Sequence, residues 1–227
     1  MGKNVKIKRG LDIALEGQPE NKVYEVTAPV TFAIKPRDFK GLIPKLLVKQ
    51  GDEVKAGDCL FTDKGNSSIC FTSPVSGEIA DIVRGERRAV LEVKILADSE
   101  ISYKTFDTSG FSSKSRDEIK SLMLEAGLWP FIVQRPFGVL ADTDVIPKAI
   151  HVSGFDSAPL APDLNISLQG EESNLKIGFE VLKMLTDGKV HLNLHTKRDK
   201  NVYNQVSGVE INTFEGPHPS GLVGVQI

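Results

Sequence analysis

Five short turns built around glycine divide residues 44–93 into brief apolar segments, and their spacing restricts what this stretch can fold into. The turns are the dipeptides Gly51-Asp52, Gly57-Asp58, Gly65-Asn66, Ser76-Gly77 and Arg84-Gly85. Glycine tolerates the positive φ of a tight turn, and an Asp or Asn side chain can bond to the nearby backbone. Segments this short at regular spacing predict a small all-β barrel or sandwich.

The order of these turns is more specific than their number. GDxVxxGDxL at residues 51–60 is followed by SPVSGxI at residues 73–79, which resembles the lipoyl/biotinyl type of β domain. In carrier members of that family a lysine at a hairpin tip takes biotin or lipoate. The tip falls near Asn66 here, and Lys64 is two residues out of register. We therefore expect a structural barrel without covalent biotin or lipoate.

Length and charge exclude several classes of protein. The chain has 227 residues and a net charge of −2, which suits one large or two ordinary soluble domains and gives no basic face for nucleic acid. No apolar run is long enough for a transmembrane helix, and the start lacks a signal core.

Cys59 and Cys70 cannot make a four-cysteine metal site. A disulfide is one reading of this pair, but we expect free thiols in a reducing compartment.

The chain divides into three parts by pattern. Residues 1–40 form an N-terminal segment with strands at 5–10 and 31–35, and residues 41–96 form the barrel. Residues 97–227 show the pattern of an α/β domain. One helix is expected within residues 112–129, capped by Asp117 or the serines before it and ended by Gly127. Its apolar stripe is Ile119, Leu122, Met123 and Ala126, and a second helix is expected at 171–185. The strands of this domain are expected at 148–152, 189–195 and 208–214. This order predicts a partly parallel sheet.

Few motifs carry recognisable chemistry. There is no glycine-rich dinucleotide or phosphate loop, and the loop at residues 153–157 has a single glycine. His191 and His195 share a strand face, but no further ligands for a metal are evident. No catalytic residue can be assigned. The turn Gly216, Pro217 and His218 is either a rigid structural turn or a loop site. The cluster at residues 84–88 suits a solvated hairpin, or a dock for an acidic partner.

Residues 127–138 form an unusual loop that contains three aromatic residues, one arginine and two prolines. Such a loop can simply carry its own hydrophobic anchors. It also offers aromatic faces and one strong hydrogen-bond donor, which suits a planar ligand with carbonyl groups. Both interpretations remain open from the residues alone.

Several motifs taken in order resemble one family. They are IKRGLD at residues 7–12, DKxN at 63–66, FTSPxSG at 71–77, RGxxR at 84–88, GLW at 127–129, RPF at 135–137 and GPHPxGL at 216–222. This chain is similar to the A subunit of the bacterial sodium-translocating NADH:quinone oxidoreductase. That family's chains continue well past this one, so we expect a truncated N-terminal portion of such a protein.

The resemblance implies a peripheral subunit on the cytoplasmic face of the bacterial inner membrane. Its partners would be the other subunits, especially the integral membrane subunit that handles quinone and flavin. Electrons would pass from NADH to a quinone such as ubiquinone, coupled to sodium export. Flavins and iron–sulfur clusters would lie in the partners, and the isolated chain would be inactive.

The resemblance associates the A subunit with quinone binding, and the aromatic and cationic side chains of two loops suggest where quinone binds. The expected residues lie in two loops, residues 31–41 and 131–138, and are Phe32, Lys35, Arg37, Phe39, Phe131, Arg135 and Phe137. The family is distantly similar to the flavin- and NADH-binding subunit of respiratory complex I, so the α/β domain is expected to be Rossmann-like. Bulky residues from Trp129 to Phe137 replace the glycines that lie against FMN there, and this argues against FMN or NAD in this chain.

Two other functions are compatible with the residues. One is a scaffold subunit of the same complex, or of a related Rnf-type electron-transport complex, without a ligand of its own. The other is a biotin- or lipoate-carrier domain, against which the missing tip lysine counts.

Overall fold

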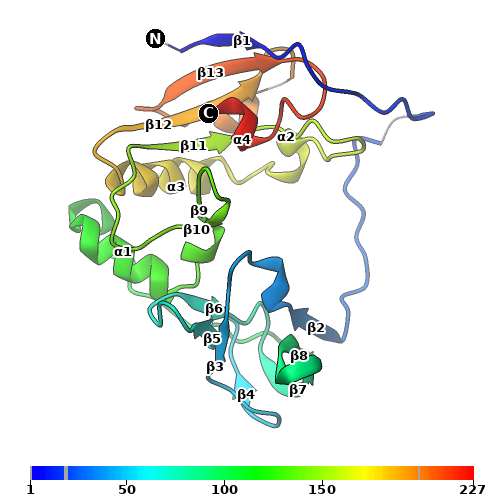
Figure 1. The fold of residues 1–227 in the computed structure, drawn as a ribbon, viewed down its shortest axis with the longest axis vertical. Helices are drawn as coiled ribbons and strands as arrows, with labels where there is room; N and C mark the ends of the chain where they lie inside the picture. Colours follow the sequence, from blue (N-terminus) through cyan, green and yellow to red (C-terminus); the bar gives the residue numbers. More distant parts are fainter. Residues whose placement is uncertain (1, 18–19, 199) are drawn as a thin grey trace. The chain divides into compact units, whose positions relative to one another are not determined.

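The chain folds into two compact units in the computed structural model, which describes residues 2–17, 20–198 and 200–227 (Figure 1). The barrel unit is Val26–Asp144, and the α/β unit is Met1–Glu25 together with Val145–Ile227. This division differs from the expected one at two places. Residues before 26 join the α/β unit, and residues 97–144 join the barrel unit, because long-range pairing outweighs position in the sequence.

The barrel contains two antiparallel sheets with strand orders β2-β8-β7-β4 and β3-β5-β6. Their strands are β2 (Thr31–Ile34), β3 (Pro44–Leu46), β4 (Glu53–Val54), β5 (Cys59–Asp63), β6 (Cys70–Thr72), β7 (Gly77–Arg84) and β8 (Val90–Ala97). The glycine turns form as the sequence predicted. Gly51 and Gly57 have φ of 86° and 98°. Asp52 and Asp58 each accept a bond from the backbone N–H three residues earlier, at 2.9 and 2.8 Å.

The barrel core is aliphatic and aromatic. Leu60, Phe61, Ile79, Val93 and Ile95 are fully buried. Phe61 stacks on Phe71 with ring centroids 4.9 Å apart. Inward residues of both sheets thus meet in one core, as expected for a barrel-sandwich hybrid fold.

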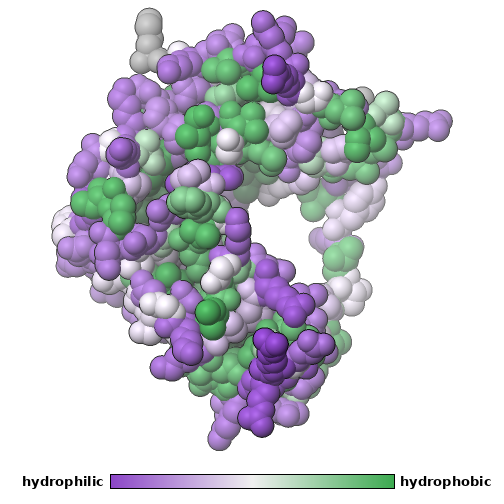
Figure 2. Space-filling view, in the orientation of Figure 1, coloured by the Kyte–Doolittle hydropathy of each residue, from purple (hydrophilic) through white to green (hydrophobic). Residues whose placement is uncertain are grey.

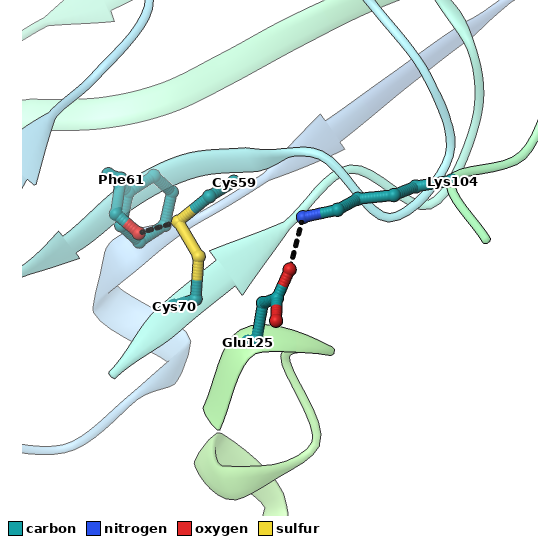
Figure 3. The surroundings of a disulfide bond; sticks show 5 residues. All are labelled: Cys59, Phe61, Cys70, Lys104 and Glu125. Carbon is teal, nitrogen blue, oxygen red and sulfur yellow. Dashed lines mark hydrogen bonds and ion pairs between the residues drawn. A yellow bond between two sulfur atoms is a disulfide. The ribbon is translucent and has the colours of Figure 1, made fainter. Parts of the chain in front are cut away.

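Cys59 and Cys70 form a disulfide, which corrects the expectation of free thiols (Figure 3). The two cysteines lie on β5 and β6, which pair directly, and their Cα atoms are 5.6 Å apart. That separation lies within the range that a disulfide spans. The expectation of free thiols rested on the redox state of the compartment, whereas the disulfide depends on the register of β5 against β6.

Residues 98–144 complete the barrel unit. An ion pair of 3.1 Å joins Lys104 to Glu125 beside the disulfide (Figure 3). The 3₁₀ turn η3 (Phe111–Ser113) precedes helix α1 (Arg116–Glu125), whose N-cap Ser115 forms a capping box with Glu118. The turn η4 (Trp129–Phe131) and the hairpin of β9 (Val133–Gln134) and β10 (Val139–Leu140) follow.

Helix α1 confirms part of the expected stripe. Ile119 and Met123 are buried, but Leu124 is the third buried residue, and Leu122 stays half-exposed. Gly127 ends the helix with φ of 70°, as predicted for a C′ glycine.

The α/β unit is built on a four-stranded sheet of order β1-β13-β12-β11 in which every pair is parallel. Its strands are β1 (Asn4–Lys6), β11 (Ala149–Ser153), β12 (Lys189–His195) and β13 (Glu210–Glu215). Helix α3 (Glu172–Met184) covers one face, where Phe179 packs with Leu192 and Leu194. The remaining elements are α2 (Leu164–Ser167), η5 (Asn201–Tyr203) and α4 (Val223–Gln226). Figure 1 shows β1 lying along β13.

No helix formed by the described residues is long and apolar enough to cross a membrane.

Candidate functional site

The first loop, residues 31–41, leaves the barrel from an edge strand. Among the described strands β2 pairs with β8 alone, and η1 (Pro36–Asp38) turns the chain toward β3. Phe39 is half-buried, and its ring meets Phe71 edge-on at 4.7 Å. Because Phe71 in turn stacks on Phe61, Phe39 is anchored to the aromatic core. Phe32 is also half-buried and lies opposite Ile95.

The cations of this loop have different partners. Lys35 lies 3.6 Å from Glu92, which it shares with Lys94. Lys40 Nζ donates to the backbone oxygen of Phe137 at 2.6 Å. That bond joins the first loop to the second, so the structure brings together two segments about a hundred residues apart.

The second loop, residues 131–138, spans the end of η4 and the β9–β10 hairpin. Trp129, at its base, is buried and donates from Nε1 to the Ala141 oxygen at 2.8 Å. Phe131 is 76% exposed and Phe137 is 68% exposed, and Arg135 is also exposed. The loop is therefore fixed at its base and presents its aromatic faces outward.

A cleft of about 870 Å³ lies beside the first loop. Of the residues predicted for a quinone site, it is lined by Arg37 and Phe39. The other five, Phe32, Lys35, Phe131, Arg135 and Phe137, do not line it. The sequence did not point to Arg84 and Arg88 as lining residues, although it drew attention to their cluster.

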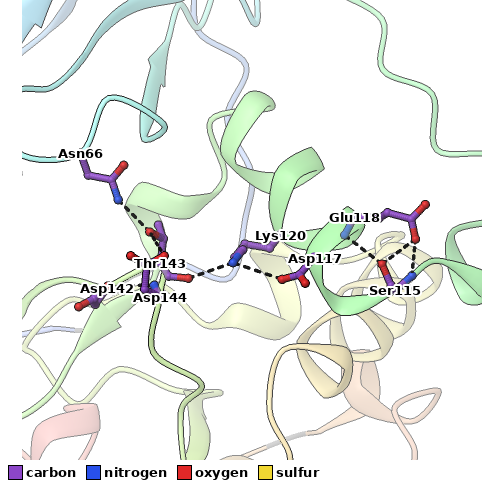
Figure 4. A network of polar contacts seen from close by, with 8 residues as sticks. All are labelled: Asn66, Ser115, Asp117, Glu118, Lys120, Asp142, Thr143 and Asp144. Atoms are coloured by element: carbon purple, nitrogen blue, oxygen red, sulfur yellow. Dashed lines mark hydrogen bonds and ion pairs between the residues drawn. The ribbon is translucent and has the colours of Figure 1, made fainter.

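The β5–β6 hairpin tip is held by polar bonds (Figure 4). Asn66 Nδ2 donates to Thr143 Oγ1 at 2.8 Å, and its Oδ1 accepts from the Ser68 N–H. Lys120 Nζ donates to the Thr143 oxygen at 3.2 Å and lies 3.3 Å from Asp117 (Figure 4). Bonds from the Ser115 side chain and N–H lower the pKa of Glu118 in the adjacent capping box. The tip is thus tied to the segment after β10.

We predict that the tip takes no biotin or lipoate, because Asn66 occupies the expected lysine position and is bonded to Thr143. The chain is expected to show its unmodified mass after coexpression with biotin and lipoate ligases. A known carrier domain in the same cells serves as the positive control. A mass increase that maps to Lys64 would contradict the prediction.

The turn Gly216, Pro217 and His218 lies in the α/β unit and contacts the N-terminal segment. The His218 N–H donates to Asp12 Oδ1 at 2.7 Å, and its Nδ1 lies 3.0 Å from Ser157 Oγ. A Cβ on Gly216 would lie 2.2 Å from the Ile7 oxygen. These contacts are those of a tightly packed turn, and its use as a ligand site stays a prediction.

Two histidines of the sheet, His151 and His191, lie in a polar cluster, whereas the His195 ring meets the Phe155 ring edge-on. The rings of His151 and His191 stack with centroids 4.4 Å apart, and Asn212 Nδ2 lies 3.2 Å from His191 Nδ1. Burial, and then His191, lower the pKa of His151, and burial first lowers the pKa of His195. Among the described residues no group of three or more His, Cys, Asp or Glu could hold a metal ion.

A chain of amide bonds continues from this cluster. Asn193 is fully buried, accepts from Asn212 Nδ2 at 3.0 Å and donates to Gln226 Oε1 at 3.1 Å. Gln226 Nε2 donates to Ser153 Oγ and to the Ser220 oxygen. These bonds fix α4 against the carboxyl ends of the central strands, where α/β sheets often bind ligands. Here the polar groups satisfy one another.

Two family models match the sequence. One is described as the NqrA N-terminal barrel-sandwich hybrid domain, over residues 5–98, and the other as the NqrA second alpha/beta domain, over residues 114–227. The antiparallel sheets of the barrel and the parallel sheet agree with these two descriptions, whereas the matched ranges divide the chain between residues 98 and 114 and the compact units divide it after residues 25 and 144.

Similar curated proteins carry one name, that of the A subunit of the Na(+)-translocating NADH-quinone reductase. Those of Neisseria meningitidis serogroup B and Yersinia pestis are 36% identical over 225 residues, and that of Glaesserella parasuis is 34% identical over 226 residues. Each match covers 98% of this chain and 50% of the relative. The chain therefore spans about half the length of the curated relatives it matches.

Proposed function

This chain belongs to the NqrA family, the A subunits of the Na(+)-translocating NADH-quinone reductase, and from that premise we propose that its first and second loops bind quinone. The proposal rests chiefly on one observation. Lys40 Nζ donates to the Phe137 oxygen at 2.6 Å, so the two loops are neighbours within the barrel unit.

The chemistry of these loops suits a quinone ring. Such a ring needs apolar faces and one or two donors for its carbonyl oxygens. Phe131 and Phe137 are exposed and supply the faces. Arg135 supplies a charged donor, which also favours a reduced, anionic quinone. Arg37 is a second donor, whereas Lys35 already lies beside Glu92.

Phe39 and Phe32 have a supporting place in this proposal. Both are half-buried against the barrel, and Phe39 packs on the Phe71 ring. They set the position of the first loop, and their exposed edges extend its apolar surface. The loop Gly216, Pro217 and His218 belongs to the other unit and has no part in this proposed site.

We further propose that the catalytic activity belongs to an assembled complex. In it, electrons pass from NADH to quinone coupled to sodium export, and this chain is a peripheral subunit on the cytoplasmic face of the membrane. Flavins and iron–sulfur clusters are assigned to partner subunits, including the integral membrane subunit next to the quinone. We assign no FMN or NAD to this chain, since Trp129 and Phe131 stand where glycines would admit a phosphate.

A scaffold subunit without its own ligand is the second candidate. The bond from Lys40 Nζ to the Phe137 oxygen also favours a scaffold, because this bond holds the two loops together without a ligand. Quinone binding to the chain separates the two candidates.

Arg135→Ala is expected to weaken quinone binding by about tenfold or more. A hydrogen bond from a charged group contributes about 1.5–3 kcal/mol. Trp129 is the only tryptophan and lies at the base of the second loop, so its fluorescence reports binding. A short-chain ubiquinone analogue should quench it saturably, with a raised midpoint in the variant.

The matched control is Arg87→Ala, which removes an exposed arginine from the β7–β8 turn of the same unit. It should leave the midpoint unchanged. Quenching without saturation would support the scaffold. An equal midpoint in a folded Arg135→Ala variant would remove Arg135 from the site.

A further inference from the structure

The cleft beside the first loop is rimmed by cations. Arg37, Lys40, Arg84 and Arg88 line it, and none of the described residues that line it is acidic. All four side chains belong to exposed residues. Within the described part of the chain, no ion pair is formed by any of the four. Each of the four is therefore without a carboxylate partner at ion-pair distance among the described residues.

Two of these cations, Arg84 and Arg88, lie at the β7–β8 turn. Arg84 Nη1 donates to the Arg88 oxygen at 3.1 Å, which fixes its side chain across the turn. Arg87 and Arg88 have φ of 53° and 59°, a left-handed backbone that few residues other than glycine adopt. Arg88 lines the cleft and Arg87 does not. Strained backbone of this kind is typical of positions with a function.

The floor of the cleft is apolar. Its uncharged lining is Pro36, Phe39, Gly41, Leu42, Ile43, Pro44, Leu46, Ala89 and Val90. Ile43 is 61% exposed, and its near neighbour Leu47 is 55% exposed. Figure 2 shows strongly hydrophilic and hydrophobic side chains adjoining one another over the elements of the barrel unit. The cleft thus pairs a cationic rim with a hydrocarbon surface.

We propose that this cleft binds an anionic phospholipid, with the phosphate on Arg84 and Arg88 and the first part of an acyl chain on the apolar floor. Guanidinium groups bind phosphate oxygens in a bidentate geometry. Free phosphate would leave the floor uncovered, and an acidic peptide would offer charges without a continuous hydrocarbon chain. Basic clusters beside apolar surface are typical of sites for anionic lipid.

This site overlaps the proposed quinone site without coinciding with it, and Lys40, which joins the two loops, also lines the cleft. The two share Arg37 and Phe39, whereas Arg84 and Arg88 belong to the lipid site alone. Variants of these two arginines therefore test the lipid without testing the quinone.

The test is cosedimentation of the full 227-residue chain with vesicles of phosphatidylglycerol and of phosphatidylcholine. Binding to phosphatidylglycerol alone is expected. Arg84→Gln with Arg88→Gln should weaken it about thirtyfold, since each cation near an anionic surface contributes about fivefold. Arg84→Lys with Arg88→Lys should retain binding within about tenfold.

The matched control is Arg87→Gln with Lys55→Gln, which removes two exposed cations of the same unit outside the cleft. It should change binding by less than about threefold. The proposal would be overturned if the control variant lost as much vesicle binding as the Arg84→Gln, Arg88→Gln variant. It would also be overturned if the chain bound phosphatidylglycerol and phosphatidylcholine vesicles equally. If inorganic phosphate or polyglutamate displaced the chain from phosphatidylglycerol vesicles, the proposal would be overturned. The cleft would then be a site for a free anion or for an acidic peptide. Quenching of Trp129 by quinone should be unchanged in the Arg84→Gln, Arg88→Gln variant. A failure of the lipid proposal is therefore distinguishable from a failure of the quinone proposal.

Discussion

Phe61→Ala is expected to destabilise the barrel unit by about 3–5 kcal/mol, the usual loss for a buried phenylalanine. The Phe61 side chain is fully buried, and its ring stacks on Phe71 at 4.9 Å. Removing it leaves a cavity beneath the ring that supports Phe39. Urea denaturation followed by Trp129 fluorescence measures the effect, because Trp129 is buried in the same unit.

Phe131→Ala makes the same chemical change at a residue that is 76% exposed. Its effect on the free energy of unfolding should be within about 0.5 kcal/mol, as for other surface substitutions. If both variants shifted the midpoint equally, Phe61 would not be a core residue of this unit.

Asn193→Leu is expected to destabilise the α/β unit by about 2–4 kcal/mol. Leucine has a similar volume but leaves the Asn212 donor and the Gln226 acceptor without their bonds to Asn193. An unsatisfied buried polar group costs about 1–3 kcal/mol. Hydrogen exchange of the β12 amides locates the loss in the sheet, and urea denaturation followed by far-UV circular dichroism gives its size.

Asn204→Leu is the matched control, since Asn204 is exposed in the same unit. It should leave exchange in β12 at the native rate. A stable Asn193→Leu variant with native exchange would show that the amide chain contributes nothing to stability.

The parts of the fold that the sequence predicted are governed by local physics. The turns at Gly51 and Gly57 follow from glycine and the adjacent aspartate, which bonds within its own turn. Helix α1 follows from its Ser115 cap and from Gly127 at its end. Strand β12 was predicted with the bounds that it has.

Features that depend on how separate segments pair were either left open, as the disulfide was, or not predicted. The disulfide between Cys59 and Cys70 requires the register of β5 against β6. The grouping of residues 97–144 with the barrel depends on contacts such as Asn66 with Thr143. Neither leaves a periodic pattern in the sequence.

The candidate site likewise has features that the sequence predicted and features that only the structure shows. Aromatic and cationic residues marked the two loops, but only the structure shows the Lys40 bond that joins them. Arg84 and Arg88 resembled an ordinary charged hairpin, since the apolar floor opposite them comes from a separate stretch of sequence.

The pairing of β1 with β13 sets an order of events during synthesis. Lys3 bonds to Asn212, 209 residues later, while the barrel segment between them is continuous. At roughly 5–20 residues per second, β1 would leave the ribosome some 10–40 seconds before its partner β13 exists. Over that interval the barrel can close by itself, whereas the edge of β1 stays open to other strands. During that interval the nascent chain is therefore exposed to mispairing along β1.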